Sequence, residues 1–156
     1  MSIVELTYNK ISTDEIVEKC THPKGGAVTV FVGTTRDFYE DDTTRKDVVT
    51  LSYEADEELA LNEMKNICDE AIQKYEGLKA VLVHRLGEVG VGEVSIVCAI
   101  STPHRKEGFK ACEWMMHDLK KRVAVWKKEI YKEGDSEWKA NKEFYEDNIP
   151  EKVNLI

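Results

Sequence analysis

The feature that most constrains the fold is the alternation of short β-branched segments with longer segments of helical periodicity. Val, Ile, Thr and aromatic residues are concentrated in runs that end at polar, Gly or Pro residues, which predicts strands. The expected strands cover residues 3–7, 27–34, 48–54, 78–86, 93–101 and 123–132. A turn at Gly134 and Asp135 is expected to lead into a last short strand around Trp138.

Three segments have the periodicity of amphipathic helices. Ser12 followed by Glu15 is the pattern of a capping box and predicts the start of the first helix. The second helix is expected over residues 56–77. The third is expected to begin with Thr102 as N-cap and Pro103 at the first helical position. Its apolar stripe would consist of Phe109, Cys112, Met116 and Leu119.

Short connections join several of these strands in pairs between the helices. This order favours an α+β domain with a mixed, largely antiparallel sheet and about three helices over a doubly wound parallel sheet. A length of 156 residues suits a single domain over 1–156. The polar segment 36–47 predicts a loop, 87–92 a glycine-rich connection, and the polar tail 141–156 a segment that either frays or docks on a partner.

Composition excludes several classes of protein. No apolar run approaches the roughly 20 residues that a membrane span needs, and the first residues lack the basic and apolar regions of a signal peptide, so a cytoplasmic protein is expected. The four cysteines form no C-x-x-C pair and no metal-ligand cluster, which predicts buried, reduced thiols. The net charge of −8 argues against nucleic-acid binding.

Positive charge is nevertheless concentrated in one segment. Between His104 and Lys132 there are nine Lys and Arg against four Asp and Glu, a local balance of +5. An acidic chain that gathers its cations in this way is expected to bind an anion there. A solvated basic face explains the same composition and stays open at this point.

The placement of individual cations favours the anion-binding interpretation. His104 and Arg105 fall in the first turn of the third helix, where cations are disfavoured unless an anion is nearby. Lys127 is in line with the apolar residues Val123 and Val125 on one strand face, and such a lysine has a lowered pKa. Arg36, at the end of the strand 27–34, is a candidate anion clamp. Gly90 to Gly92 precede a strand, which excludes a phosphate loop opening a helix.

Five ordered motifs resemble the large, catalytic subunit of molybdopterin synthase over about Gly26 to Ala140. They are GAVTVFVGTTR (26–36), LSYEA (51–55), VHRLGEV (83–89), STPHR (101–105) and LKKRVAVWKKE (119–129), followed by GDSEW. The resemblance implies an α/β hammerhead fold and a sulfurtransferase that converts a cyclic pyranopterin monophosphate into molybdopterin. Sulfur would come from the C-terminal Gly-Gly thiocarboxylate of a small ubiquitin-like subunit, with a central homodimer inside a heterotetramer.

The resemblance also implies roles for individual residues. Lys120 and Lys127 would be catalytic, and no metal or other cofactor is expected. The residues expected to bind substrate are Thr34, Thr35, Arg36, His104, Arg105, Lys128 and Glu129. A second hypothesis is a non-catalytic module that only docks the tail of a ubiquitin-like protein. The chain departs from the family pattern at Val123-Ala124-Val125, but Lys120 and Lys127 keep their spacing.

Overall fold

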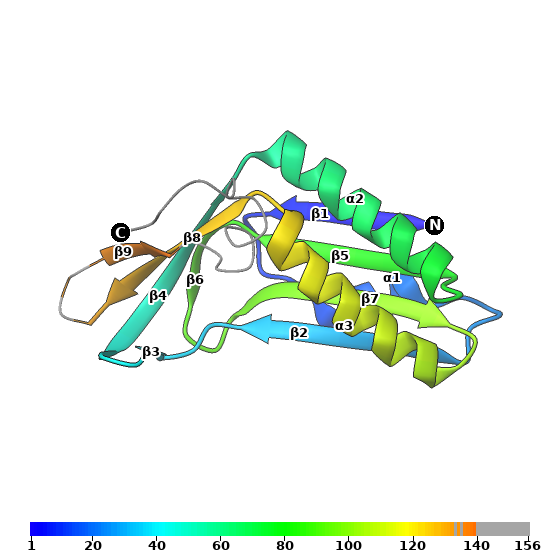
Figure 1. Cartoon of the computed structure of the whole chain (residues 1–156), viewed down its shortest axis with the longest axis horizontal. Helices are drawn as coiled ribbons and strands as arrows, with labels where there is room; N and C mark the ends of the chain where they lie inside the picture. The colour runs from blue at the N-terminus through cyan, green and yellow to red at the C-terminus, as the bar shows by residue number, and fades with distance from the viewer. Residues whose placement is uncertain (133, 135, 140–156) are drawn as a thin grey trace, which may run out of the picture.

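A computed structural model describes residues 1–132, 134 and 136–139. A four-stranded sheet forms the centre of the fold (Figure 1). Its strands are β1 (Ser2–Thr7), β5 (Lys79–Arg85), β7 (Val94–Thr102) and β2 (Ala27–Thr34), in that spatial order. β1 pairs with β5 in parallel, and the other two pairings are antiparallel.

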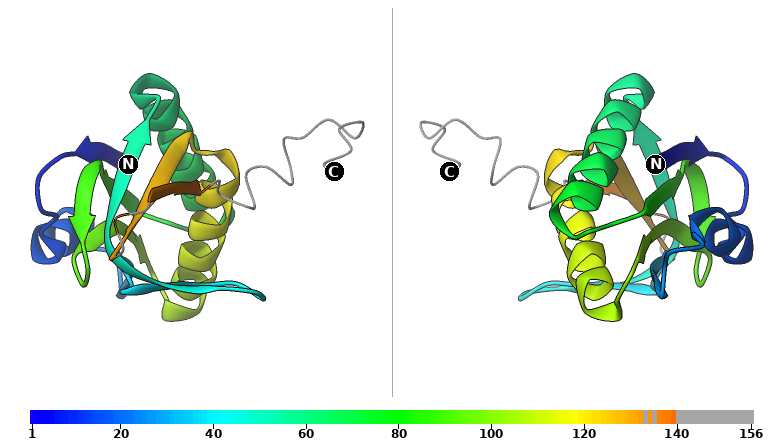
Figure 2. Two further views of the ribbon diagram at one scale, coloured as in Figure 1. Left: turned by 90° about the vertical axis from the view of Figure 1, so that its left-hand side faces the viewer. Right: turned by 90° about the vertical axis from the view of Figure 1, so that its right-hand side faces the viewer.

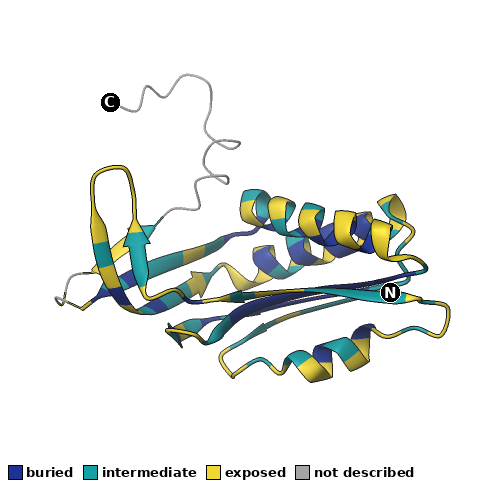
Figure 3. Cartoon of the chain, turned by 90° about the horizontal axis from the view of Figure 1, so that it is seen from below, coloured by how far each residue is buried: buried dark blue, intermediate teal, exposed yellow. Residues whose placement is uncertain are grey.

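Helices cover both faces of this sheet (Figures 2 and 3). The helices α2 (Glu57–Lys74) and α3 (Arg105–Arg122) lie on one face, and α1 (Thr13–Cys20) lies on the other. Alternate residues of β5 therefore enter two cores: Ala80 and Leu82 pack under α2 and α3, while Val81 and Val83 pack against α1. Burial on both faces explains why the central strands are almost continuously apolar.

A second, five-stranded sheet adjoins the first at the end where β2 and α3 finish (Figure 1). The long strand β4 (Arg45–Ala55) is its centre. One edge of β4 pairs with β8 (Val125–Tyr131), which pairs in turn with β9 (Ser136–Lys139). The short strands β3 (Phe38–Glu40) and β6 (Gly87–Gly90) also pair with β4. The mixed, largely antiparallel α+β fold with three helices is therefore confirmed.

The prediction of a loop over 36–47 is wrong, because β3 and the start of β4 form a hairpin there. Asp41 closes its turn: Oδ1 accepts hydrogen bonds from the backbone N–H groups of Thr43 (2.8 Å) and Thr44 (2.7 Å). Polar residues that suggested a loop are therefore turn residues of a strand pair. The glycine-rich connection 87–92 is likewise partly strand, since β6 occupies Gly87–Gly90.

The predicted start of the third helix is two residues too early. Thr102 is the last residue of β7, fully buried, and its hydroxyl donates to the carbonyl of His104 at 2.7 Å. His104 is the N-cap of α3, without a side-chain capping bond. Phe109 is 64% exposed, so the predicted stripe is wrong at this position; the buried stripe contains Gly108, Ala111, Cys112, Met115 and Leu119.

Gly108 allows α3 to lie directly on β2. A Cβ at this position would overlap Thr29 Oγ1 and lie 3.0 Å from Thr102 Oγ1. We expect Gly108→Ala to lower the free energy of unfolding by about 1–3 kcal/mol, because overpacking outweighs the gain of roughly 1 kcal/mol in helix propensity. Urea denaturation measures this, with the exposed Lys110→Ala of the same helix as control. An unchanged or raised stability of Gly108→Ala would contradict the packing argument.

The remaining expectations concern the cysteines, membrane spans and the polar tail. All four cysteines are free and buried, as predicted. Within the described part of the chain, no helix is both long and apolar enough to cross a bilayer. The tail predicted over 141–156 lies outside the described residues.

Candidate functional site

One face of the second sheet gathers lysines, carboxylates and tyrosines. Residues directly opposite each other in an antiparallel ladder share a face, and the register places Lys127 between Tyr53 on β4 and Lys139 on β9. Glu129 lies opposite Glu137, and Val48 lies opposite Tyr131. We call this the lysine face; its polar members are Tyr39, Lys46, Tyr53, Lys127, Glu129, Tyr131, Glu137 and Lys139.

Lys127 is the electrostatic centre of this face. Its side chain is 39% exposed, and Nζ lies 3.8 Å from Glu129 Oε1. Burial lowers the pKa of Lys127, and the positive charges of Arg36, Lys120 and Lys139 lower it further, while Glu129 acts in the opposite direction. Three cations from other elements therefore lie close enough to act on Lys127. This confirms the expected lowering of its pKa and shows that its surroundings are unusually positive.

Glu129 is fixed beside Lys127 by a buried hydrogen bond. Only 4% of Glu129 is exposed, and the Tyr131 hydroxyl donates to Glu129 Oε2 at 2.9 Å. Burial, together with this carboxylate, raises the pKa of Tyr131 well above its usual range. Because Tyr131 occupies one carboxylate oxygen, the other remains directed toward Lys127.

Lys120 is on α3, the helix that covers the first sheet, and its charge acts on Lys127 at the lysine face. It lies in the last turn of α3, where the backbone N–H of Val123 still donates to the carbonyl of Leu119 at 3.0 Å. Val123 and Ala124 are buried and lead directly into β8. The short connection therefore carries the chain from Lys120 to Lys127 without a loop that could separate them.

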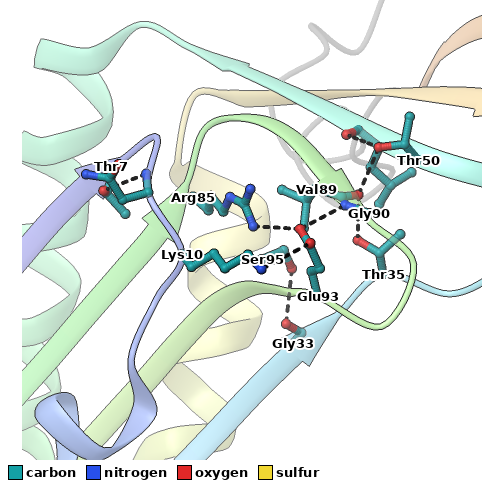
Figure 4. A network of polar contacts seen from close by, with 12 residues as sticks. Thr7, Lys10, Gly33, Thr35, Thr50, Arg85, Val89, Gly90, Glu93 and Ser95 are labelled. Carbon is teal, nitrogen blue, oxygen red and sulfur yellow. Dashed lines mark hydrogen bonds and ion pairs between the residues drawn. The ribbon is translucent and has the colours of Figure 1, made fainter.

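Arg36 is positioned by the residue before it. Thr35 is buried, and its backbone N–H donates to the carbonyl of Glu93 at 3.1 Å. Its hydroxyl donates to the carbonyl of Val89 at 3.3 Å (Figure 4). Thr35 thus anchors the end of β2 to the β6–β7 turn, while Thr34 is exposed. The guanidinium of Arg36 lies 5.2 Å from the centre of the Phe38 ring.

The β6–β7 turn is itself held by an ion pair. Arg85 Nη1 donates to Glu93 Oε2 at 2.8 Å, and the backbone N–H of Gly90 donates to the same oxygen at 3.2 Å (Figure 4). The Gly90 N–H, with Arg85, lowers the pKa of Glu93. The carboxylate therefore stays charged and keeps the turn on which Thr35 depends in place.

Some predicted site residues are not brought to the lysine face of the same chain. His104 and Arg105 are exposed at the opposite end of α3, about 22 Å along the helix axis from Lys120 at 1.5 Å per residue. Lys128 points to the opposite face of β8, where Nζ lies 5.6 Å from the centre of the Trp138 ring. Arg122 is a structural residue, paired with Glu63, Glu70 and Asp118 at 2.8–3.1 Å.

Sequence reasoning missed Lys139, Tyr131 and Tyr53 as members of this face. The signal for Lys139 was present, because two strands joined by a tight turn at Gly134 place residues equally distant from the turn opposite one another. In the described residues, no three His, Cys, Asp or Glu side chains are grouped in a way that could hold a metal ion.

Known proteins share both the sequence and the fold. The profile of the family described as MoaE protein matches residues 6–122. The molybdopterin synthase catalytic subunit of Culex quinquefasciatus is 48% identical over 143 residues, covering 90% of this chain and 88% of the relative. The Homo sapiens catalytic subunit is 41% identical, covering 92% of this chain and 73% of the relative.

A solved structure of molybdopterin synthase from Staphylococcus aureus superposes with a TM-score of 0.79 at 32% identity, covering 86% of this chain and 95% of that one. The matched family segment includes β2, Arg36 and all of α3, and the wider alignments cover most of the chain. The chain therefore belongs to the MoaE protein family, the family of molybdopterin synthase catalytic subunits.

Proposed function

We propose that the chain is the sulfurtransferase subunit of molybdopterin synthase, an enzyme of molybdenum cofactor biosynthesis. The observation that carries the proposal is the half-buried Lys127, whose pKa is lowered by burial and by the charges of Arg36, Lys120 and Lys139. Such a site holds more positive charge than its own carboxylates balance, which suits a substrate that is a phosphate and a sulfur donor that is a thiocarboxylate. The family membership supports the same activity.

The proposed chemistry assigns one task to each lysine. The thiocarboxylate sulfur forms a bond to a pterin side-chain carbon as a carbon–oxygen bond at that carbon breaks. Water then adds to the acyl carbon, and the acyl–sulfur bond breaks to leave a carboxylate on the small subunit and a thiol on the pterin. Lys120, at the exposed end of α3, would stabilise the oxyanion that forms at the acyl carbon. Lys127 would bind the pterin phosphate and donate a proton to the oxygen that leaves the pterin.

The partner and the assembly are part of the proposal. A small ubiquitin-like subunit would insert its Gly-Gly tail beside Lys120, and two catalytic subunits would form the centre of a heterotetramer. Free, buried thiols fit a reducing compartment, so we place the reaction in the cytoplasm. Because His104 and Arg105 lie far from Lys120 in one chain, their proposed substrate-binding role needs contacts that this single chain does not make.

Reconstitution tests this function directly. The purified chain, a thiocarboxylated small subunit and the cyclic pterin phosphate are expected to give molybdopterin, measured by fluorescence of its oxidised derivative. The competing tail-docking hypothesis predicts no binding of the pterin phosphate to the chain alone, which calorimetry can measure. No product together with no pterin binding would overturn the proposed function and leave the docking hypothesis.

Arg36 is expected to contribute to substrate affinity. Arg36→Ala should raise the KM for the pterin phosphate about 10- to 100-fold, because a charge-assisted hydrogen bond to an anion is worth roughly 1.5–3 kcal/mol. Steady-state kinetics measures the change. Arg45→Ala is the matched control: Arg45 also lies over Phe38, at 4.7 Å, but is not among the groups with the largest effects on the pKa of Lys127. Equal KM values for the two variants would remove Arg36 from the site.

A further inference from the structure

Lys139 occupies an unusual position on the lysine face. β3 and β9 are the two outer strands of the order β3-β4-β8-β9, yet Lys139 Nζ lies 3.8 Å from the centre of the Tyr39 ring. The side chains of Lys139 and Tyr39 therefore lean toward each other over the face of the sheet instead of pointing away from its edges. The Lys139 side chain is only 19% exposed, and its ammonium is directed over the surface that holds Lys127.

Two contacts hold this ammonium in place. Glu137 Oε2 lies 3.2 Å from Lys139 Nζ, and the Tyr39 ring covers one side of it. Burial acts to lower the pKa of Lys139, but hydrogen bonds to Glu137 and Tyr39 outweigh burial and raise it. Lys139 therefore stays protonated at neutral pH. An ammonium has three donors, so Glu137 and the ring leave donor capacity for a ligand.

The charges around Lys127 do not balance. Lys139 lies directly opposite Lys127, an arrangement that is destabilising for like charges unless an anion lies between them. Among the described residues, the four cations Arg36, Lys120, Lys127 and Lys139 lie around two carboxylates, Glu129 and Glu137, and exceed them by two positive charges. This is the charge pattern of a site that receives an oxyanion from solution.

We propose that Lys139 is a further substrate-binding residue of the site, supplying a fixed positive charge for the oxyanion that Lys127 receives. The inference rests on the proposed function. The oxyanion has two sources, the phosphate of the pterin and the carboxyl end of the small subunit, and both present oxygens that an ammonium can bind. Glu137 and Tyr39 are positioning residues that act through Lys139.

The test compares Lys139→Gln with Lys139→Arg, using the reconstituted enzyme with its thiocarboxylated partner. We expect Lys139→Gln to raise the KM about tenfold for the substrate whose oxyanion it binds, with a smaller change in kcat, and Lys139→Arg to restore most of the affinity. Titrating the pterin phosphate and the small subunit separately identifies the source of the anion. Lys132→Gln, an exposed lysine beyond the end of β8, is the matched control.

The pH profile separates substrate binding from a merely structural role. The charged groups with the largest effects on Lys127 are Glu129, Arg36, Lys120 and Lys139; Glu137 and Lys46 lie on the same face, and Tyr53 is its cross-strand neighbour. Removing the positive charge of Lys139 raises the pKa of Lys127, so the alkaline limb of the profile should move to higher pH in Lys139→Gln and stay in place in Lys139→Arg. A lost packing contact would not move it.

The possible outcomes distinguish a failure of the role inferred for Lys139 from a failure of the proposed function. If Lys139→Gln matches the wild type in both KM values within twofold and keeps its pH profile, the inference is overturned while the proposed function stands. If the wild type makes no molybdopterin, the proposed function fails first. Should Lys139→Gln fold poorly by circular dichroism, Lys139→Met keeps the aliphatic stem against Tyr39 without the charge, and the same two readouts apply.

Discussion

Replacing Lys127 by alanine is expected to reduce the rate of molybdopterin formation on the order of 10³-fold, within the range for loss of a positioned proton donor. Lys127 is half-buried, paired with a buried carboxylate and surrounded by three other cations. Single-turnover measurement with saturating thiocarboxylated small subunit isolates the chemical step. Lys127→Arg should not restore the rate, because a guanidinium keeps its proton at every accessible pH.

The wild-type rate should also depend on pH through this residue. Burial, with the charges of Arg36, Lys120 and Lys139, lowers the pKa of Lys127 below the ordinary 10.5, and the protonated form is the active one. The rate is therefore expected to fall as the pH rises through this lowered pKa. Lys132→Ala should keep both the rate and the profile. A Lys127→Ala enzyme within tenfold of the wild type would exclude the proposed role.

The central sheet could be predicted from sequence because each of its strands has a local residue pattern that indicates a strand. β5 and β7 are buried on both faces, so apolar, β-branched residues are nearly continuous in them. The predicted strand 27–34 coincides with β2, and Ser12 is the N-cap of α1 as expected. These features depend on residues close together in the chain, and local periodicity is sufficient to detect them.

The errors arise where distant contacts decide the structure. Thr102 is a good N-cap residue, yet it continues β7, because its backbone pairs with Ala27 and its hydroxyl is satisfied by the carbonyl of His104. Phe109 fits a helical stripe by spacing, but Gly108 rests on Thr29 and turns the phenylalanine side of α3 outward. Local propensity could not reveal the pairing of Thr102 with Ala27 or the contact of Gly108 with Thr29, since both join residues far apart in the sequence.

The types of residue at the candidate site could be predicted from the sequence, but their arrangement in space could be predicted only in part. Lys120 and Lys127 are seven residues apart and joined by a buried connection, and the charge of Lys120 acts on Lys127. His104 and Arg105 belong to the same basic segment, but a helix of 18 residues separates them from Lys120. Lys139 was missed because its position depends on the register of the β8–β9 hairpin, and a count of charges along the sequence carries no information about register.

A buried histidine that contacts Tyr53 of the lysine face is expected to make the fold acid-sensitive. His84 is 6% exposed, its ring lies 4.9 Å from that of Tyr53, and Nδ1 lies 2.8 Å from the carbonyl of Arg85. A carbonyl only accepts, so the proton of the neutral ring is on Nδ1. Burial lowers the pKa of His84 to about 4 from 6.5, despite the Arg85 hydrogen bond.

The sign of the effect follows from which state binds the proton. Between pH 6.5 and about 4 the unfolded chain is protonated at His84 and the folded chain is not, so the free energy of unfolding falls as the pH falls through this window. The full loss is about 3 kcal/mol, at 1.36 kcal/mol per pKa unit, and about 2 kcal/mol of it is expected between pH 7 and pH 5. Urea denaturation at these two pH values measures it.

His84→Asn is the discriminating variant, because its side-chain amide can still donate to the carbonyl of Arg85 but does not titrate. It should be less stable than the wild type at pH 7, having lost the ring packed on Tyr53, yet about 2 kcal/mol less sensitive to the change to pH 5. His117→Asn, at an exposed position on α3, should keep the wild-type sensitivity. Since Tyr53 lies opposite Lys127, protonating His84 disturbs a residue that borders the proposed site. Equal pH sensitivity in His84→Asn and the wild type would show that another group makes the fold acid-sensitive.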